Sequence, residues 1–261
     1  WDVIGWMSDI QGWRRDDRGA YYRTFYSPNN ATLVLVGDFD PEQALPLIRK
    51  HFEPIPAGTP PPLVTTVEPP QVGIKQVTIR KEALTPCFAM AFHAPAGTGP
   101  DFAALRVLDL VLLHGESARL HKRLVRQEQL ATSVQGGVQA TIDPFLFMIQ
   151  VKPVVGADTA RIEAAILEEL ARIRDHGIQP RELQKALNVL RSEHYFDLET
   201  IEGKAGQLGW AEVFLGGWDR LFTELERYDR VTPEEVRQAA VRYFSDRNLT
   251  IGQLLPEKDT P

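Results

Sequence analysis

The residues closest to a metal-binding cluster in this sequence are His114, Glu116 and His121. On a continuous helix, the seven-residue separation of the two histidines would place both imidazoles on one face. The pair lacks the four-residue spacing with which two histidines share one Zn²⁺ while a glutamate serves as base, and Gly115 interrupts the helix. The sequence therefore predicts no metal ligands in this chain, and a loose site at these three residues is the alternative.

The other reactive residue types form no catalytic signature. Cys87 is the only cysteine, which excludes an intrachain disulfide and a cysteine metal cluster and leaves the compartment open. The glycine-rich segments 96–99 and 136–137 lack the Lys and Ser/Thr of a phosphate loop. Among the remaining histidines, His194 lies on an apolar helical face and is expected in the core, whereas the others suit solvated or capping positions. We therefore expect no catalytic residue in this chain.

Composition narrows the function further. The chain has 29 basic and 35 acidic residues, a net charge of −6, and no run of basic residues interleaved with aromatics, which argues against nucleic-acid binding. A hydrophobic fraction of 43% is ordinary for a globular protein, and no apolar run reaches the length of a membrane span.

A short sequence unit occurs twice. Copy one (residues 22–38) and copy two (residues 241–251) align without a gap at an offset of 218 residues, the size of a domain. Each has an aromatic pair, a serine, an asparagine and then an apolar run, which predicts the end of a helix, a polar turn and a strand. The alternative is that turn chemistry alone has produced the similarity.

The periodicity predicts the elements around this unit. Strands are expected at residues 31–36, 74–80 (half-buried), 87–93, 132–141 and 145–154. Helices are expected at residues 16–26 and 41–52, at 105–112 with a continuation at 120–125, and in four further segments between 162 and 243. This order favours an α+β fold, an antiparallel-rich sheet with helices packed on one face.

Proline sets the expected domain boundary. Seven prolines lie between residues 54 and 70, which indicates an extended linker. The expected division is a partial first domain at residues 1–56, a linker at 57–72 and a complete domain at 73–261. The partial domain would be a remnant of a second copy of the same fold.

Three segments carry a family resemblance. Residues 27–42 resemble the helix-to-strand junction of the M16 (pitrilysin/insulinase-like) zinc metallopeptidases. Residues 117–134 resemble the helix-to-strand segment of that family's second domain, and residues 232–256 resemble its end. The resemblance implies two similar α+β domains per half-molecule. It also implies that an inverted His-x-x-Glu-His zinc motif lies upstream of the segment matched here.

The resemblance sets the functional expectations. It implies the C-terminal portion of a zinc-dependent endopeptidase that encloses the substrate chamber, with zinc held by the intact protein and this chain alone inactive. The implied partners are a peptide substrate and a second M16 subunit or a homodimer, and the implied compartment is a bacterial periplasm or cell envelope. The alternative is a non-catalytic assembly member of the processing-peptidase or bc1 core-protein type.

One substrate-binding residue is expected from the same resemblance. Some M16 domains bind substrate with an Arg/Tyr pair. In this sequence the arginine position is Val125, with Arg126 one residue later, and the tyrosine position is Thr132. Arg126 is therefore the substrate-binding candidate, and the incomplete pair resembles the half that carries the metal.

Overall fold

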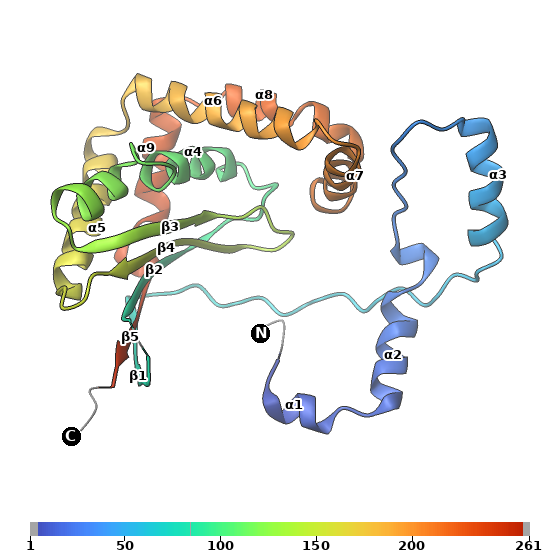
Figure 1. Ribbon diagram of the computed structural model, residues 1–261, viewed down its shortest axis with the longest axis horizontal. Coiled ribbons are helices and arrows are strands. Elements are labelled where there is room, and N and C mark those ends of the chain that lie inside the picture. The colour runs from blue at the N-terminus through green and yellow to red at the C-terminus, as the bar shows by residue number, and fades with distance from the viewer. Residues whose placement is uncertain (1–4, 84, 258–261) are drawn as a thin grey trace.

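The computed structural model describes residues 5–83 and 85–257 and has two unequal parts (Figure 1). Short helices and extended chain form residues 5–74, and a sheet covered by helices forms the rest. The elements before the sheet are α1 Met7–Gly12, α2 Arg15–Phe25, the 3-10 turn η1 Pro28–Asn30 and α3 Pro41–Phe52. The strands are β1 Lys75–Lys81, β2 Cys87–Ala94, β3 Ala131–Val138, β4 Phe145–Pro153 and β5 Leu249–Pro256.

The remaining helices lie between or after these strands. They are α4 Phe102–Leu112, the π-helix η2 His121–Gln127, α5 Thr159–His176, α6 Pro180–Asp197, α7 Ile201–Trp210, the π-helix η3 Ala211–Leu215, the 3-10 helix η4 Trp218–Phe222, α8 Glu224–Asp229, α9 Pro233–Tyr243 and the 3-10 turn η5 Asp246–Asn248.

The five strands form one sheet in the order β1-β5-β2-β4-β3. The pairs β5–β2, β2–β4 and β4–β3 are antiparallel, and β1 pairs parallel with β5. Figure 1 shows the helices of this part gathered on one side of the sheet. The predicted α+β fold, antiparallel-rich with helices on one face, is confirmed.

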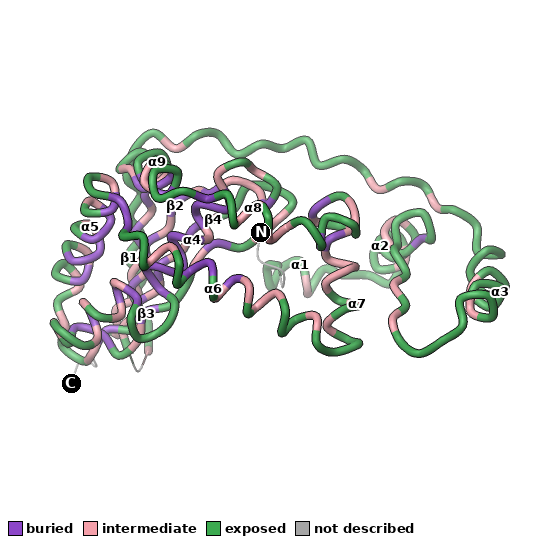
Figure 2. Tube along the Cα trace, turned by 90° about the horizontal axis from the view of Figure 1, so that it is seen from above, coloured by how far each residue is buried: buried purple, intermediate pink, exposed green. Residues whose placement is uncertain are grey.

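The core lies between the sheet and these helices, where Figure 2 shows most of the buried chain. Along β2, Phe88, Met90 and Phe92 are buried and alternate with less buried residues. This period of two places alternate side chains on the helix-covered face. The apolar stripe of α4 and the apolar residues of α5 and α9 cover them.

Capping residues mark the ends of several helices. Asp40 accepts from the Glu42 N–H at 2.9 Å at the start of α3, which continues through Pro46. Thr232 and Glu235 form a reciprocal capping box at the start of α9. Gly177 ends α5 with φ 71°, a left-handed conformation that glycine adopts without strain.

Two strand predictions need correction. Residues 31–36 form no strand, although Ala31 is extended at φ −135° and ψ 141°, because no other segment of the described chain pairs with them. β1 is a strand, but its side chains are exposed rather than half-buried. As the edge strand beside β5, it lies beyond the cover of the helices.

The two sequence copies have matching local structure. Copy one contains η1 and copy two contains η5, each preceded by an extended serine, Ser27 and Ser245. The apolar side chains of copy one are largely exposed, and Figure 2 shows this part of the chain and the following linker mainly as exposed. Val34 lies near the second part, since a Cβ placed on Gly209 of α7 would be 3.5 Å from its Cγ2 atom.

Candidate functional site

The three candidate metal ligands do not converge. His114 and Glu116 are exposed in the turn after α4, and the Glu116 carboxylate pairs with Arg126. His121 lies on η2, with its Nδ1 atom buried and without a hydrogen-bond partner. Among residues 5–83 and 85–257, no group of three His, Cys, Asp or Glu side chains could hold a metal ion.

Arg126 lies in the last turn of η2 and reaches solvent. Its side chain is 55% exposed, and that of its partner Glu116 is 79% exposed. An ion pair this exposed contributes little to stability, on the order of 0–1 kcal/mol. The guanidinium is thus held near a carboxylate that another acceptor could replace, and its planar donors suit a carboxylate or carbonyl oxygen.

The other two residues of the expected pair give less support. Val125 is partly buried and packs against the core, so its side chain is not free to contact a ligand. Thr132 is exposed on β3, where its hydroxyl donates to the Lys152 carbonyl at 3.1 Å. A threonine hydroxyl at this place is shorter than a tyrosine side chain and is already engaged with the neighbouring strand.

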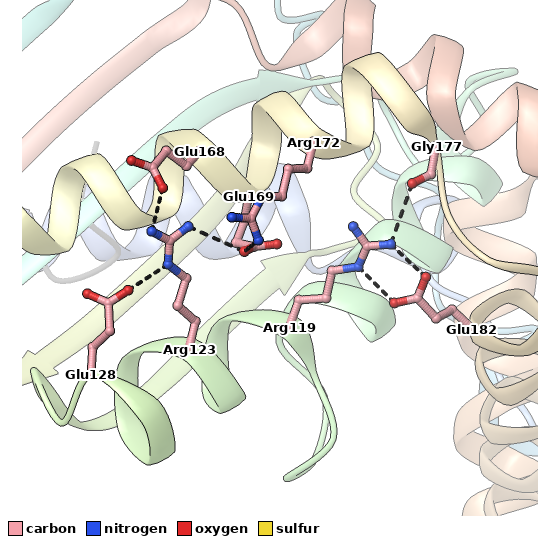
Figure 3. Close-up of polar contacts among 8 residues, drawn as sticks. All are labelled: Arg119, Arg123, Glu128, Glu168, Glu169, Arg172, Gly177 and Glu182. Carbon is pink, nitrogen blue, oxygen red and sulfur yellow. Dashed lines mark hydrogen bonds and ion pairs between the residues drawn. The ribbon is translucent and has the colours of Figure 1, made fainter.

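An arginine clamp fixes the start of the segment that carries Arg126. Arg119 donates to both carboxylate oxygens of Glu182, at 2.7 and 2.6 Å, as Figure 3 shows. Glu182 also accepts from the Gln179 N–H at 2.8 Å. Burial raises the pKa of Glu182, but the hydrogen bonds from Arg119 and Gln179 outweigh it and hold the pKa below its ordinary value. The clamp therefore ties this segment to α6 through an ionised carboxylate.

A second arginine ties η2 to α5. Arg123 contacts Glu128 at 2.7 Å, Glu168 at 2.5 Å and Glu169 at 3.3 Å, and Arg172 contacts Glu169 at 2.8 Å (Figure 3). Burial opposes the charge of Arg123, yet the hydrogen bonds that it donates to Glu128 and Glu168 raise its pKa. Glu169 is buried, and its carboxylate is neutralised by two arginines.

The backbone of this segment is unusual. η2 is a π-helix of seven residues, a form that occurs mainly as short stretches and often at functional sites. It is followed by Gln129 at φ 52°, the one non-glycine residue with positive φ among those the structure describes. The clamps at Arg119 and Arg123 hold this strained segment in place beside β3.

The sheet face opposite the helices is open (Figure 1). On β2 and β5 the residues alternating with the core, Ala89, Ala91, Thr250 and Gly252, are partly exposed and small. Met148 of β4 pairs with Ala91 beside them. Partly exposed Gln150, which pairs with Ala89, lies on the same face of the sheet.

The other histidines and the cysteine considered in the sequence lie at separate positions in the fold. His194, expected in the core, is partly exposed on α6 beside Tyr195, because that end of α6 extends past the core; burial lowers the pKa of its imidazole. Cys87 is exposed at the start of β2. His93 contacts Asn248 and Glu68.

The sequence did not reveal the arginine clamps. Apart from Glu128, which is five residues from Arg123, their carboxylate partners lie 45 to 63 residues away along the chain, so spacing could not indicate them. The one available signal was the series Arg119, Arg123 and Arg126 at helical intervals.

No helix among the described residues is long and apolar enough to span a membrane.

The family model described as "Peptidase M16 inactive domain" matches residues 13–190. A zinc protease named PqqE from Helicobacter pylori is 28% identical over 268 residues, which cover 98% of this chain and 58% of that protein. The crystal structure of a protease from Helicobacter pylori superimposes with a TM-score of 0.91 at 24% identity, covering 98% of this chain and 62% of the other. This chain thus spans less than two thirds of these relatives.

Two more distant structures share the fold. The periplasmic protease PqqL from Escherichia coli gives a TM-score of 0.74 at 17% identity, over 97% of this chain and 30% of that one. Complex III2 from Candida albicans gives a TM-score of 0.77 at 15% identity, over 97% of this chain and 61% of the other. The fold therefore occurs both in a protease and in complex III2.

Proposed function

The chain belongs to the peptidase M16 family, and from this premise we propose that it is the C-terminal portion of a zinc-dependent endopeptidase and forms part of the wall of its substrate chamber. The match of the inactive-domain model to residues 13–190 confirms the family resemblance. The whole protein's zinc, its peptide substrate and a second M16 subunit or homodimer are parts of the same proposal.

The observation that carries this proposal is the open sheet face. A chamber wall for peptides of varied sequence needs a surface without deep side-chain pockets. The small residues Ala89, Ala91 and Gly252 provide one. An extended chain can lie close to such a surface, and partly exposed Met148 adds an adaptable apolar contact.

The described residues do not form a zinc site. His114, Glu116 and His121 lie near one another in sequence, but Glu116 is engaged with Arg126 and the Nδ1 atom of His121 is buried. We therefore assign no catalytic step to these residues. The proposal assigns peptide contact, rather than bond cleavage, to this part of the protein.

Arg126 is the proposed peptide-contacting residue. Its guanidinium is exposed and its partner Glu116 is more exposed still, so a substrate carboxylate or carbonyl could take the place of Glu116. The clamps at Arg119 and Arg123 would keep the position of this guanidinium fixed relative to the sheet.

The domain division remains part of the proposal: residues 1–56 as the end of a first M16-like domain, 57–72 as the linker and 73–261 as the second. Two observations support it. The main core cluster begins at Phe88, and the helices α1, α2 and α3 contain no buried residues.

A non-catalytic assembly role is the second candidate. It is supported by the fold shared with complex III2. The two candidates differ in one observation, the presence of a His-x-x-Glu-His motif upstream of residue 1 in the parent protein. A compartment such as the periplasm would follow the first candidate, by analogy with PqqL.

The test uses the parent protein and a peptide substrate. Arg126→Ala should lower kcat/KM about ten- to a hundredfold, because a charge-assisted contact of ~1.5–3 kcal/mol is lost. Thr132→Ala is the matched control and should leave kcat/KM within about threefold, since this hydroxyl is bonded to β4.

Two outcomes would contradict the proposal. An unchanged kcat/KM in Arg126→Ala removes the peptide-contact role. A loss beyond about a hundredfold in Thr132→Ala, ~2.7 kcal/mol of transition-state stabilisation, would mean that Thr132 acts as the tyrosine of the pair does and that the subunit type is wrong.

A further inference from the structure

The end of the linker contacts the sheet through Glu68 and Gln71. Glu68 Oε1 lies 3.4 Å from His93 Nε2 at the end of β2. Three residues later, Gln71 donates to the Leu249 carbonyl at 2.7 Å and accepts from the Thr250 hydroxyl at 3.3 Å. These contacts join residues 68–71 to the two central strands β2 and β5, although the linker between residues 59 and 70 has no helix or strand.

The side chain of Asn248 determines where the protons of His93 lie. Its Nδ2 atom donates to the carbonyls of Tyr243 at 2.8 Å and His93 at 3.0 Å. Two carbonyl acceptors fix the orientation of the amide, so the Oδ1 atom faces His93. Oδ1 accepts from the His93 backbone N–H at 3.2 Å and lies 3.0 Å from Nδ1. Nδ1 must therefore carry a proton.

Whether the other ring nitrogen, Nε2, carries a proton then depends on the charge of the ring. A neutral imidazole has one N–H, which Asn248 assigns to Nδ1, so Nε2 is left with a lone pair. The Glu68 carboxylate has only acceptor oxygens. The contact between Glu68 and Nε2 is attractive only when His93 carries both protons. In the neutral ring, lone pairs face each other across this contact.

The charged groups around His93 show which residue can pair with it. His93 is 32% exposed and Glu68 is 65% exposed. The charged residues on the neighbouring elements are Asp246 and Arg247 beside Asn248, Lys75 on β1 and Lys152 at the far end of β4. Of the carboxylates in the described chain, Glu68 is the one within ion-pair distance of His93.

We propose that Glu68, His93 and Asn248 form a proton-operated latch that fastens the linker to the sheet in acid and releases it in alkali. With His93 protonated, the ion pair and the two Gln71 contacts act together. With His93 neutral, Gln71 alone holds the linker. Because Glu68 and Gln71 contact His93 and Thr250, the latch sets how firmly the end of the linker is held to the sheet. The latch does not depend on the proposed peptidase function.

Backbone ¹⁵N relaxation of the full chain tests the latch, because it reports the motion of a linker segment whose N–H groups donate no hydrogen bond in the described chain. The order parameters of Val67, Glu68 and Gln71 are measured in the wild type and in Glu68→Gln at about pH 5.5 and about pH 8. Glutamine can form a hydrogen bond with the neutral and with the protonated ring, so the linker of Glu68→Gln should be held equally at both pH values. We expect the wild-type order parameters to be lower at the higher pH than at the lower, while those of Glu68→Gln stay the same.

Glu53→Gln provides the control, since Glu53 is an exposed carboxylate without an ion pair in the described chain. The order parameters of its linker should match those of the wild type at both pH values. Wild-type order parameters at residues 67, 68 and 71 that are the same at both pH values overturn the latch.

Nitrogen NMR of the imidazole gives the second measurement. The neutral ring of His93 should carry its proton on Nδ1, the less common tautomer, and the Asn248→Ala variant should lose this preference. A neutral His93 protonated on Nε2 in the wild type contradicts the assignment of protons and, with it, the latch.

Discussion

Copy one and copy two have the same turn. Ser27 has φ −116° and ψ 153°, and Ser245 has φ −123° and ψ 157°. In both copies the asparagine amide donates to the carbonyl five residues earlier at 2.8 Å, from Asn30 to Phe25 and from Asn248 to Tyr243. The turn is thus encoded within about six residues, as the shared serine and asparagine predicted.

The burial of the two copies is opposite. Tyr26 is 67% exposed, while its counterpart Phe244 is 1% exposed, with ring centroids 5.0 Å from both Phe92 and Phe147. Leu33 is 55% exposed and its counterpart Ile251 is 3% exposed. In copy two the apolar run is β5, paired on both sides. The comparison teaches that local sequence sets the turn, whereas distant strands decide whether the apolar run that follows is covered.

The largest expected effect concerns the apolar run of copy one, which is largely exposed in the described chain. The apolar side chains of residues 31–36, at about 1.5–3 kcal/mol each for full burial, represent on the order of 10 kcal/mol. We expect residues 13–53 to pair with the same segment of a second chain or to dock on another polypeptide. Sedimentation of the purified chain should therefore show concentration-dependent association, which Leu33→Glu weakens.

Val155→Glu is the control for that experiment. Val155 is 86% exposed in the turn before α5, so a charge there should leave association unchanged. A monodisperse monomer in which the amides of residues 31–36 exchange slowly would contradict the prediction, because slow exchange needs a cover that the monomer does not provide.

The second prediction compares truncation of the two aromatic counterparts. Phe244→Ala removes a buried ring between two phenylalanines and should lower the free energy of unfolding by about 3–5 kcal/mol. Tyr26→Ala removes an exposed ring and should change it by about 0.5 kcal/mol or less. Urea unfolding of the two variants measures both values. Equal losses would show that copy one is covered in solution as copy two is.

The sequence predicted most of the second part of the fold. Alternation gave β2, β3 and β4, and the cap at Thr232 gave the start of α9. It failed where a feature depends on a distant partner: residues 31–36 have strand composition but no paired strand, and β1 has strand alternation but no covering helix. Periodicity indicates which face is apolar, and it does not show what lies against that face.

The same distinction between local sequence and distant partners applies to the candidate site. Arg126 was predicted because it follows Val125, the arginine position of the family's pair, and its guanidinium is exposed. The partners that position it, such as Glu182 for Arg119, could not be predicted because no local pattern links them. The contact between Glu68 and His93 has the same character, since it joins a proline-rich linker to a strand end.

The smallest expected effect isolates one polar contact of copy two. The Tyr243 hydroxyl donates to Asp101 at 2.9 Å, and the counterpart Phe25 in copy one has no hydroxyl. Burial, followed by the hydrogen bond to Asp101, raises the pKa of Tyr243. Because the pKa is raised on folding, this contribution to stability is complete below the pKa of the unfolded chain. It is lost as pH rises through the folded pKa, above about 10.

Tyr243→Phe should therefore lower the free energy of unfolding by about 1 kcal/mol at neutral pH, and its deficit against the wild type should shrink above about pH 10. The loss is small because Asp101 keeps its ion pair with Arg242. Phe25→Tyr, which adds the hydroxyl to copy one, should change neither the stability nor its pH dependence, since the Phe25 ring packs against Tyr21, 4.6 Å between ring centroids, whereas Asp101 is the acceptor of copy two. Urea unfolding at several pH values checks both variants. A deficit in Tyr243→Phe that persists at alkaline pH would assign the loss to packing of the ring, and the contrast between the copies would then rest on apolar burial alone.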